Sequence, residues 1–267
     1  MNPVQLLRDR QHVSALRLRE PQHDGLRWIE PRANLVQGNY SAVCSLAVGG
    51  ETRQSVLLND TSTQHSLQLM GDGQCEVRML AVGGGGYGTS YGGGGGGSGF
   101  IAYYADVLPG FTELTVTVGD SDEFLSHSSK VLANGEVILE AGPGRSGGYG
   151  GGDGFSGGGG DSSSTNSKYH GGSNGADGEG SSGGDGTQQD ITSFKFDSFV
   201  LSGGEGGFLH AGGGGGGVLV GGAGPARQHL GQGQGYGGGG EGQLDWESDY
   251  SPSGLPGLVI IEVRHKK

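Results

Sequence analysis

Short apolar runs alternate with blocks of glycine along most of this chain. The runs have the length of β-strands, are apolar or alternate apolar with polar positions, and are rich in Val, Ile, Leu, Phe and Tyr; they occupy residues 77–82, 100–107, 114–118, 137–141, 194–201, 218–220 and 258–263. Such runs are typical of strands that bury one or both faces. A chain with this many buriable strands is expected to fold as a mainly β protein.

The first 80 residues have an ordinary composition and carry most of the alternating pattern. Alternation of period two is found at residues 12–18, 42–48, 55–58, 66–70 and 75–82. Turn sequences separate these segments at Gly49-Gly50, at Asn59-Asp60 and around Gly73. This arrangement predicts antiparallel hairpins packed as a β-sandwich.

Glycine accounts for 64 of the 267 residues, and its longest blocks are at 83–86, 92–97, 157–160, 212–217 and 237–240. A glycine block has no side chain to bury, so it is either disordered or packed backbone against backbone. Polyglycine II helices, with three residues per turn and no internal hydrogen bonds, can pack in this way because no Cβ holds neighbours apart. We expect a bundle of such helices. For residues 147–190 a flexible excursion remains an equal alternative.

The net charge of −12 argues against general nucleic-acid binding, which needs clustered Lys and Arg. The charge is uneven, because residues 1–40 carry six Arg and four acidic residues while the rest of the chain is strongly acidic. This N-terminal arm could dock on the acidic body of another copy, or it could be a solvated basic face.

The chain contains only Cys44 and Cys75, which lie in two different predicted strands. They could form one disulfide in an oxidising compartment, or they could be two buried thiols. Asn39 and Asn59 fit the N-glycosylation pattern. We expect an extracellular or matrix-associated protein, although no signal peptide is visible and no apolar stretch is long enough to span a membrane.

No motif indicates catalysis. Matches to GxGxxG arise by chance in so glycine-rich a chain, no P-loop lysine follows any of them, and neither GxSxG match lies between a strand and a helix. The histidines are scattered, and the acidic residues follow no calcium-binding repeat. We therefore expect no enzymatic activity, no cofactor and no metal site.

The run VRMLAVGGGGYGTSYGGGGGGSGFIAYYADVLPGFTELTVTVGD, residues 77–120, resembles the glycine-rich module of the anaplastic lymphoma kinase and leukocyte tyrosine kinase receptor ectodomains. The later sequences HAGGGGGGVLVGGAG, GYGGGGEG and PGLVIIEV continue the resemblance, which covers about residues 66–263. It implies a tumour-necrosis-factor-like sandwich with an inserted bundle of polyglycine II helices. Phage tail-fibre tip adhesins use a similar bundle to bind receptors. This chain has no kinase domain, so signalling is not implied.

Together the patterns predict an antiparallel β-sandwich with a glycine-rich bundle of polyglycine II helices, and the resemblance implies that the sandwich is of the TNF-like or jelly-roll type with the bundle inserted in it. The expected divisions are an arm with first strands at 1–40, sandwich strands at 41–82, the glycine-rich domain with interspersed strands at 83–255, and a closing strand with a basic tail at 256–267. We expect a self-assembling structural protein whose partner is itself, or alternatively a recognition module for a protein or glycan ligand. Aromatic residues at the edges of the blocks are the candidate contacts: Tyr87, Tyr91, Tyr149, Tyr169, Phe208 and Tyr236.

Overall fold

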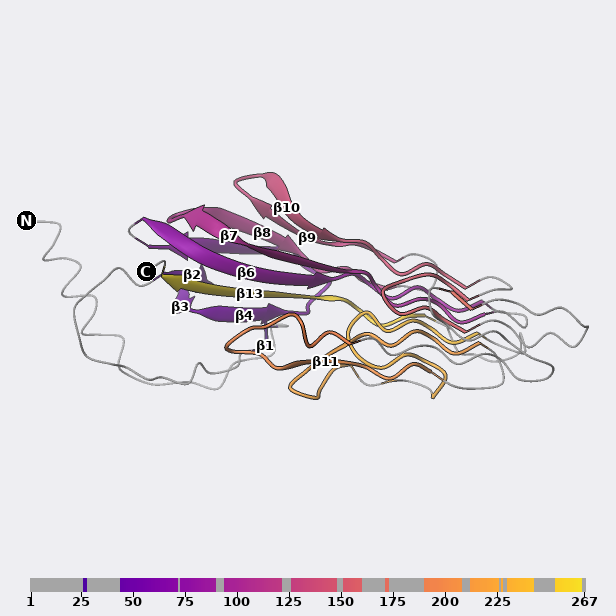
Figure 1. The fold of residues 1–267 in the computed structure, drawn as a ribbon. Helices are drawn as coiled ribbons and strands as arrows, with labels where there is room; N and C mark the ends of the chain where they lie inside the picture. The colour runs from indigo at the N-terminus through magenta and orange to yellow at the C-terminus, as the bar shows by residue number, and fades with distance from the viewer. Residues whose placement is uncertain are drawn as a thin grey trace, which may run out of the picture.

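The computed structural model describes residues 26–27, 44–71, 73–89, 94–121, 126–147, 151–159, 171–172, 190–207, 212–225, 227, 230–242 and 253–265. This part of the chain is mainly β, its sheets are antiparallel, and it contains no helix. Two sheets pack face to face as a sandwich, and the glycine segments extend from one end of it (Figure 1). None of the described residues forms a helix that could cross a membrane.

The first sheet has five strands, with the C-terminal strand in its centre. In spatial order they are β1 (Leu26–Arg27), β4 (Ser55–Leu58), β13 (Leu258–His265), β6 (Gln74–Val82) and β7 (Ile101–Pro109). β13 pairs antiparallel with both β4 and β6. The centre of this sheet therefore depends on pairing between strands that are far apart in the chain.

The second sheet has six strands and faces the first. In spatial order they are β10 (Glu136–Ala141), β9 (Ser129–Ala133), β8 (Glu113–Thr117), β5 (His65–Met70), β2 (Ser45–Val48) and β3 (Glu51–Arg53). A tight turn at Asn134–Gly135, with φ of 49° and 87°, connects β9 and β10. Asn followed by Gly, both with positive φ, is typical of a two-residue hairpin turn.

The centre of the first sheet, at β13, β4 and the last residues of β6, is buried on both faces. Alternate residues of β13, such as Val259 and Ile261, face the core between the two sheets, while Leu258 and Ile260 face a second apolar cluster on the outer side. The outer cluster contains the small sheet of β11 (Leu201–Gly203) and β12 (Val218–Val220). This double burial explains why residues 258–261 form a continuous apolar run rather than an alternating one.

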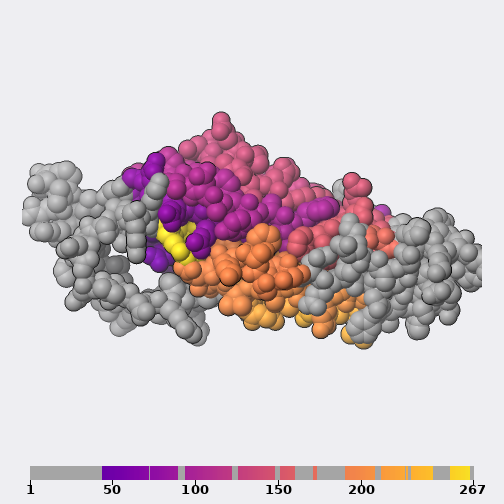
Figure 2. Space-filling model, in the orientation of Figure 1, coloured from indigo at the N-terminus to yellow at the C-terminus, as the bar shows by residue number. Residues whose placement is uncertain are grey.

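The expected strand at residues 194–201 is wrong except at its end, since only Leu201 belongs to β11. The backbone N–H groups of Asp197 and Ser198 donate to the carboxylate of Glu262, at 3.0 and 2.9 Å, instead of entering a ladder. Glu262 is 3% exposed, so this buried carboxylate fixes the segment as a turn over the sheet. The segment forms part of the outer layer that covers the sandwich (Figure 2).

Strands of the sandwich and glycine segments alternate along the chain, so no single position divides the two parts. β7, β8, β9 and β10 belong to the two main sheets although they lie between glycine blocks. The chain enters and leaves the glycine region several times, and the passages at 83–89, 94–100 and 142–147 each begin or end at a sandwich strand. The expected segment at residues 12–18 lies outside the described residues.

Candidate functional site

Residues 94–100 form the centre of the glycine region, and their backbone N–H groups point in turn to three different neighbours. The direction repeats every third residue: Gly95 and Ser98 donate to Gly159 and Ser156, Gly96 and Gly99 to Gly240 and Gly237, and Gly97 and Phe100 to Arg145 and Gly142. A β-strand would direct alternate residues to the same side. The backbone of this segment therefore has a period of three, not two.

Six segments surround this central one. Three of them accept hydrogen bonds from its N–H groups, namely 156–159, 237–242 and 142–147. The other three donate N–H groups to its carbonyl groups, namely 83–89, 151–153 and 212–217. Each segment of the ring is also bonded to the next. The bonds that close the ring are Gly144 to Gly84, Arg145 to Asp153, Gly158 to Gly152, Gly159 to Gly213, Gly239 to Gly215 and Gly240 to Gly86, at 2.7–3.0 Å.

At many of the positions where these segments touch, only glycine fits. A Cβ built on Gly96 would lie 2.1 Å from the carbonyl oxygen of Gly86, and one on Gly99 would lie 1.9 Å from that of Gly83. Comparable overlaps, with backbone atoms at about 2 Å, occur at Gly85, Gly144, Gly158, Gly214 and Gly239. The glycine blocks are thus required by the close approach of the backbones.

The rim of the bundle carries side chains where it faces solvent. In segment 142–147, Gly144 is buried, while Arg145 and Ser146 are exposed. In segment 204–207, Gly204 and Gly207 are buried, while Glu205 is exposed. Because these side chains project from the rim, another glycine segment cannot approach these positions as closely as the inner segments approach one another.

Serine hydroxyl groups join the bundle to the sandwich. Ser129, the first residue of β9, donates from its Oγ to the carbonyl of Val82 at 2.6 Å. Ser121 and Ser126 both donate to the carbonyl of Gly85, at 2.7 and 2.8 Å. These bonds satisfy carbonyl groups at the point where β6 gives way to the bundle, and they fix the bundle relative to the sheets.

One end of the bundle lies away from the sandwich. Gly83 follows β6, Gly142 follows β10 and Gly217 precedes β12, so these residues mark the near end. The opposite ends of the segments lie together, since Thr89 N–H donates to Gly94, Gly147 N–H donates to Tyr87 and Gly242 N–H donates to Gly212. We call this the distal end; residues 90–93, 148–150 and 208–211 connect segments that end there (Figure 1).

The six aromatic candidates have different outcomes. Tyr87 is half-buried near the distal end. Tyr236 is 4% exposed and belongs to the outer apolar cluster, so its assignment as a binding residue is wrong. The ring of Tyr236 packs between the bundle and the first sheet instead of lying at the surface. Tyr91, Tyr149, Tyr169 and Phe208 lie outside the described residues.

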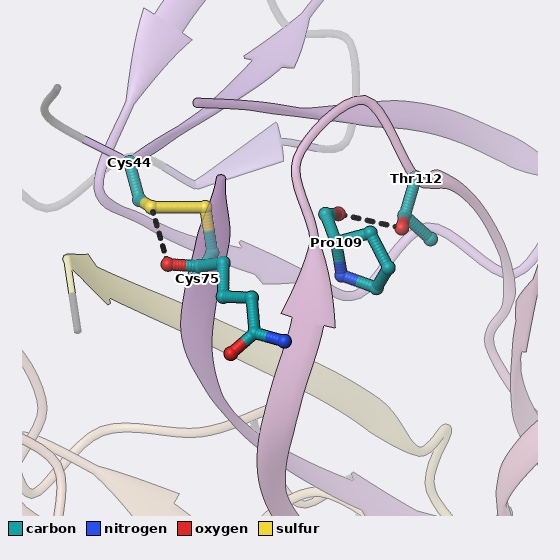
Figure 3. Close-up of a disulfide and its surroundings, with 5 residues drawn as sticks. Cys44, Cys75, Pro109 and Thr112 are labelled. Atoms are coloured by element: carbon teal, nitrogen blue, oxygen red, sulfur yellow. Dashed lines mark hydrogen bonds between the residues drawn. A yellow bond between two sulfur atoms is a disulfide. The ribbon is translucent and has the colours of Figure 1, made fainter. Parts of the chain in front are cut away.

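Cys44 and Cys75 form a disulfide, which is one of the two alternatives that the sequence left open. Cys75 is in β6 of the first sheet, and Cys44 directly precedes β2 of the second, so the bond crosses between the sheets (Figure 3). Both residues are buried. Asn59 donates from its side-chain amide to the hydroxyl of Tyr236 at 3.2 Å and is half-buried, and Asn39 lies outside the described residues.

Several ionisable groups in the described ranges form ion pairs. Arg264 and Arg78 pair with Asp197 above the buried carboxylate of Glu262. In the described ranges, no three His, Cys, Asp or Glu residues are close enough together to hold a metal ion.

Sequence reasoning missed two polar contributors. Ser98 is completely buried in the central segment, and its Oγ accepts the N–H of Ser156 at 2.8 Å. Glu262, inside an apolar strand, holds the turn at residues 197–198. Glu262 could have been found from the sequence, because an acidic residue within a strand that is otherwise apolar indicates a buried carboxylate that needs hydrogen-bond donors. Comparison of the chain with protein-family models, curated proteins and solved structures found no match.

Proposed function

We propose that this protein is a non-enzymatic recognition module in which a bundle of polyglycine II helices holds binding loops at its distal end. The observation that carries the proposal is the common position of the segment ends at Thr89, Gly147, Gly212 and Gly242. The residues that connect these ends include Tyr91, Tyr149 and Phe208, which are the aromatic types that dominate binding energy at interfaces. A protein or glycan is the proposed ligand.

The polyglycine II assignment rests on the backbone bonds. Successive N–H groups of residues 95–97 address three different neighbours, and residues 98–100 repeat the same order. A three-fold screw with outward N–H and C=O groups produces this repeat. Six neighbours bonded into a ring correspond to hexagonal packing of such helices. The jelly-roll topology is proposed alongside it, on the strength of two facing antiparallel sheets.

Rigidity is the physical advantage of such a support. A loop that is immobilised before binding loses less conformational entropy when its ligand binds. In this protein the connecting residues are short, and their ends are fixed by backbone bonds of 2.7–3.1 Å on several sides. An extracellular setting is part of the proposal, and the disulfide between Cys44 and Cys75 supports it because such bonds persist in oxidising compartments.

Self-assembly by stacking of flat glycine faces is the first function that the sequence indicated. The exposed side chains of Arg145, Ser146 and Glu205 oppose it, because they occupy outward positions on the rim. Lateral packing of two bundles at these positions would have to remove from water the charged groups of Arg145 and Glu205, which pair with Asp153 and Arg227, and this desolvation is costly. We therefore do not propose lateral stacking as the main function.

The test is a binding screen of the purified chain on printed arrays of glycans and of extracellular proteins. Tyr91→Ser, Tyr149→Ser and Phe208→Ser are compared with the wild type and with Val137→Ser, which changes an exposed apolar residue of β10 on the sandwich. The proposal expects a bound ligand that the three loop variants lose and the control keeps, with unchanged thermal unfolding. Binding that survives all three substitutions, or no binding by the wild type, would contradict it.

A further inference from the structure

Phe111 combines two features that are individually uncommon. Its side chain is 57% exposed, and its backbone has a φ of +66°, in the left-handed region. Residues other than glycine seldom adopt this conformation, and a bulky aromatic residue does so at an energetic cost. The only other described non-glycine residue with positive φ is Asn134, which is of a type that tolerates it.

The turn that presents Phe111 is firmly held. The N–H of Phe111 donates to Leu69 at 2.8 Å, and that of Gly110 donates to Gly73 at 2.6 Å. The hydroxyl of Thr112 donates to the carbonyl of Pro109 at 2.7 Å, beside the disulfide (Figure 3). Phe111 does not belong to the side chains that pack against the core between the sheets. Its strained conformation is therefore not explained by burial within its own fold.

We propose that Phe111 is an anchor for a second copy of this chain, and that it contacts residues 1–25 of that copy. Exposed aromatic residues on rigid supports are the usual centres of protein interfaces. Residues 1–25 offer matching chemistry, because Leu16 and Leu18 alternate there with Arg17 and Arg19. The leucines supply apolar contacts for the ring, and an arginine supplies a partner for the exposed carboxylate of Glu113, two residues after Phe111.

The position of β1 favours a second copy over the arm of the same molecule. β1, at residues 26–27, pairs with β4 at one edge of the first sheet, whereas Phe111 follows β7 at the opposite edge. The arm of the same molecule would have to pass over or around the sheet, and one face of the sheet is already covered by the outer apolar cluster.

This surface is separate from the proposed binding loops. β6 and β7 both have one end at the bundle, at Val82 and Ile101, and the other at Gln74 and Pro109. Phe111 follows Pro109, so it lies at the end of the sandwich away from the bundle. Association there would leave the distal ends of both bundles free, and two linked modules would bind a multivalent ligand more tightly than one.

The first test is stability. Phe111→Asn keeps a residue type that accepts the left-handed region, so its midpoint of urea unfolding is expected to equal or exceed that of the wild type. Val137→Ser, another exposed apolar position with an ordinary backbone, serves as the matched control. A clearly lower midpoint for Phe111→Asn would show that the ring stabilises its own fold and would overturn the proposal.

The second test is photo-crosslinking of the full chain with benzoylphenylalanine at position 111, in an equal mixture of ¹⁴N- and ¹⁵N-labelled protein. The proposal expects crosslinked peptides that join position 111 to residues 1–25 of the other isotope, and sedimentation velocity that shows an associated species lost in Phe111→Asn and at high salt. The same crosslinker at position 137 should give no such product. Crosslinks confined to one isotope, crosslinks to other regions, or no crosslink would each refute it.

Discussion

Replacing one central glycine by alanine tests whether the bundle is packed as described. Gly96 lies in the middle of the ring, and an added methyl group would lie 2.1 Å from the oxygen and 2.5 Å from the carbon of the Gly86 carbonyl. A third contact, to the carbonyl oxygen of Tyr87, would be 2.8 Å. All three atoms belong to backbone, so no side chain can rotate away, and segment 83–89 must move by about 1 Å to reach ordinary contact distances.

Movement of segment 83–89 would lengthen or break three buried backbone hydrogen bonds. They join Gly86 N–H to Gly97, Gly240 N–H to Gly86, and Gly96 N–H to Gly240, each at 2.8 Å. Leaving a buried donor or acceptor unpaired costs about 1–3 kcal/mol, so the loss of three partly compensated bonds lowers the free energy of unfolding by about 3–6 kcal/mol. A typical domain is stable by only about 5–15 kcal/mol, so the bundle of Gly96→Ala should be largely disrupted.

Gly142 provides the matched control. It belongs to the same bundle, but a methyl group there would meet only the ring of Phe100, at an ordinary distance of 3.7 Å. Gly142→Ala should leave stability unchanged or raise it by up to about 1 kcal/mol, because alanine restricts the unfolded chain. Urea unfolding gives the free energies, and hydrogen exchange of ¹⁵N-labelled glycine amides reports on the bundle itself. Equal stability and equal glycine protection for Gly96→Ala and Gly142→Ala would refute the packing described here.

Three further predictions concern the sandwich. Replacing both Cys44 and Cys75 by serine should lower the free energy of unfolding by about 3–4 kcal/mol, since the disulfide closes a loop with a sequence separation of 31; an unchanged urea midpoint would contradict this. Ile260→Ala and Ile261→Ala should each cost about 2–5 kcal/mol, but only Ile260→Ala should increase hydrogen exchange in β11 and β12, because Ile260 faces the outer cluster. The Ser62 hydroxyl and N–H donate to Asp60 and hold the pKa of that carboxyl below its usual 3.8. Because the folded-state pKa is the lower one, this stabilisation is complete above the unfolded pKa and is lost as pH falls through the folded value. Wild type and Asp60→Asn should therefore differ in urea midpoint near neutral pH and converge well below pH 3.8, and a constant difference would contradict it.

The alternation of apolar and polar residues was enough to predict the sandwich, because burial of one face imposes a period of two. Residues 66–70 and 75–82 became β5 and β6 with nearly the expected limits. Residues 194–201 are also rich in apolar residues, but residues 197–198 form a turn because two of their N–H groups donate to Glu262, which is distant in the sequence. A local pattern contains no information about such a partner.

The glycine blocks indicated a packed backbone but not its arrangement. Most neighbours of residues 94–100 come from distant parts of the chain, as far away as Gly240. Because glycines are chemically identical, nothing in a block specifies which other block it contacts. Tyr236 shows the same limit for the candidate site. An aromatic residue beside a glycine block fits a binding edge and a buried filler equally well, and its position between bundle and sheet decided the outcome.

The most direct test of the central claim is an NMR experiment that detects scalar couplings across hydrogen bonds in uniformly labelled protein. The described packing predicts couplings from the amide nitrogens of Gly95, Gly96 and Gly97 to the carbonyl carbons of Gly159, Gly240 and Arg145, which lie in three different segments. Ser98, Gly99 and Phe100 should repeat the pattern with Ser156, Gly237 and Gly142. Couplings from alternate residues to one or two neighbouring segments would indicate an ordinary β-ladder, and their absence from this stretch would indicate an unpaired chain; either result would contradict the account.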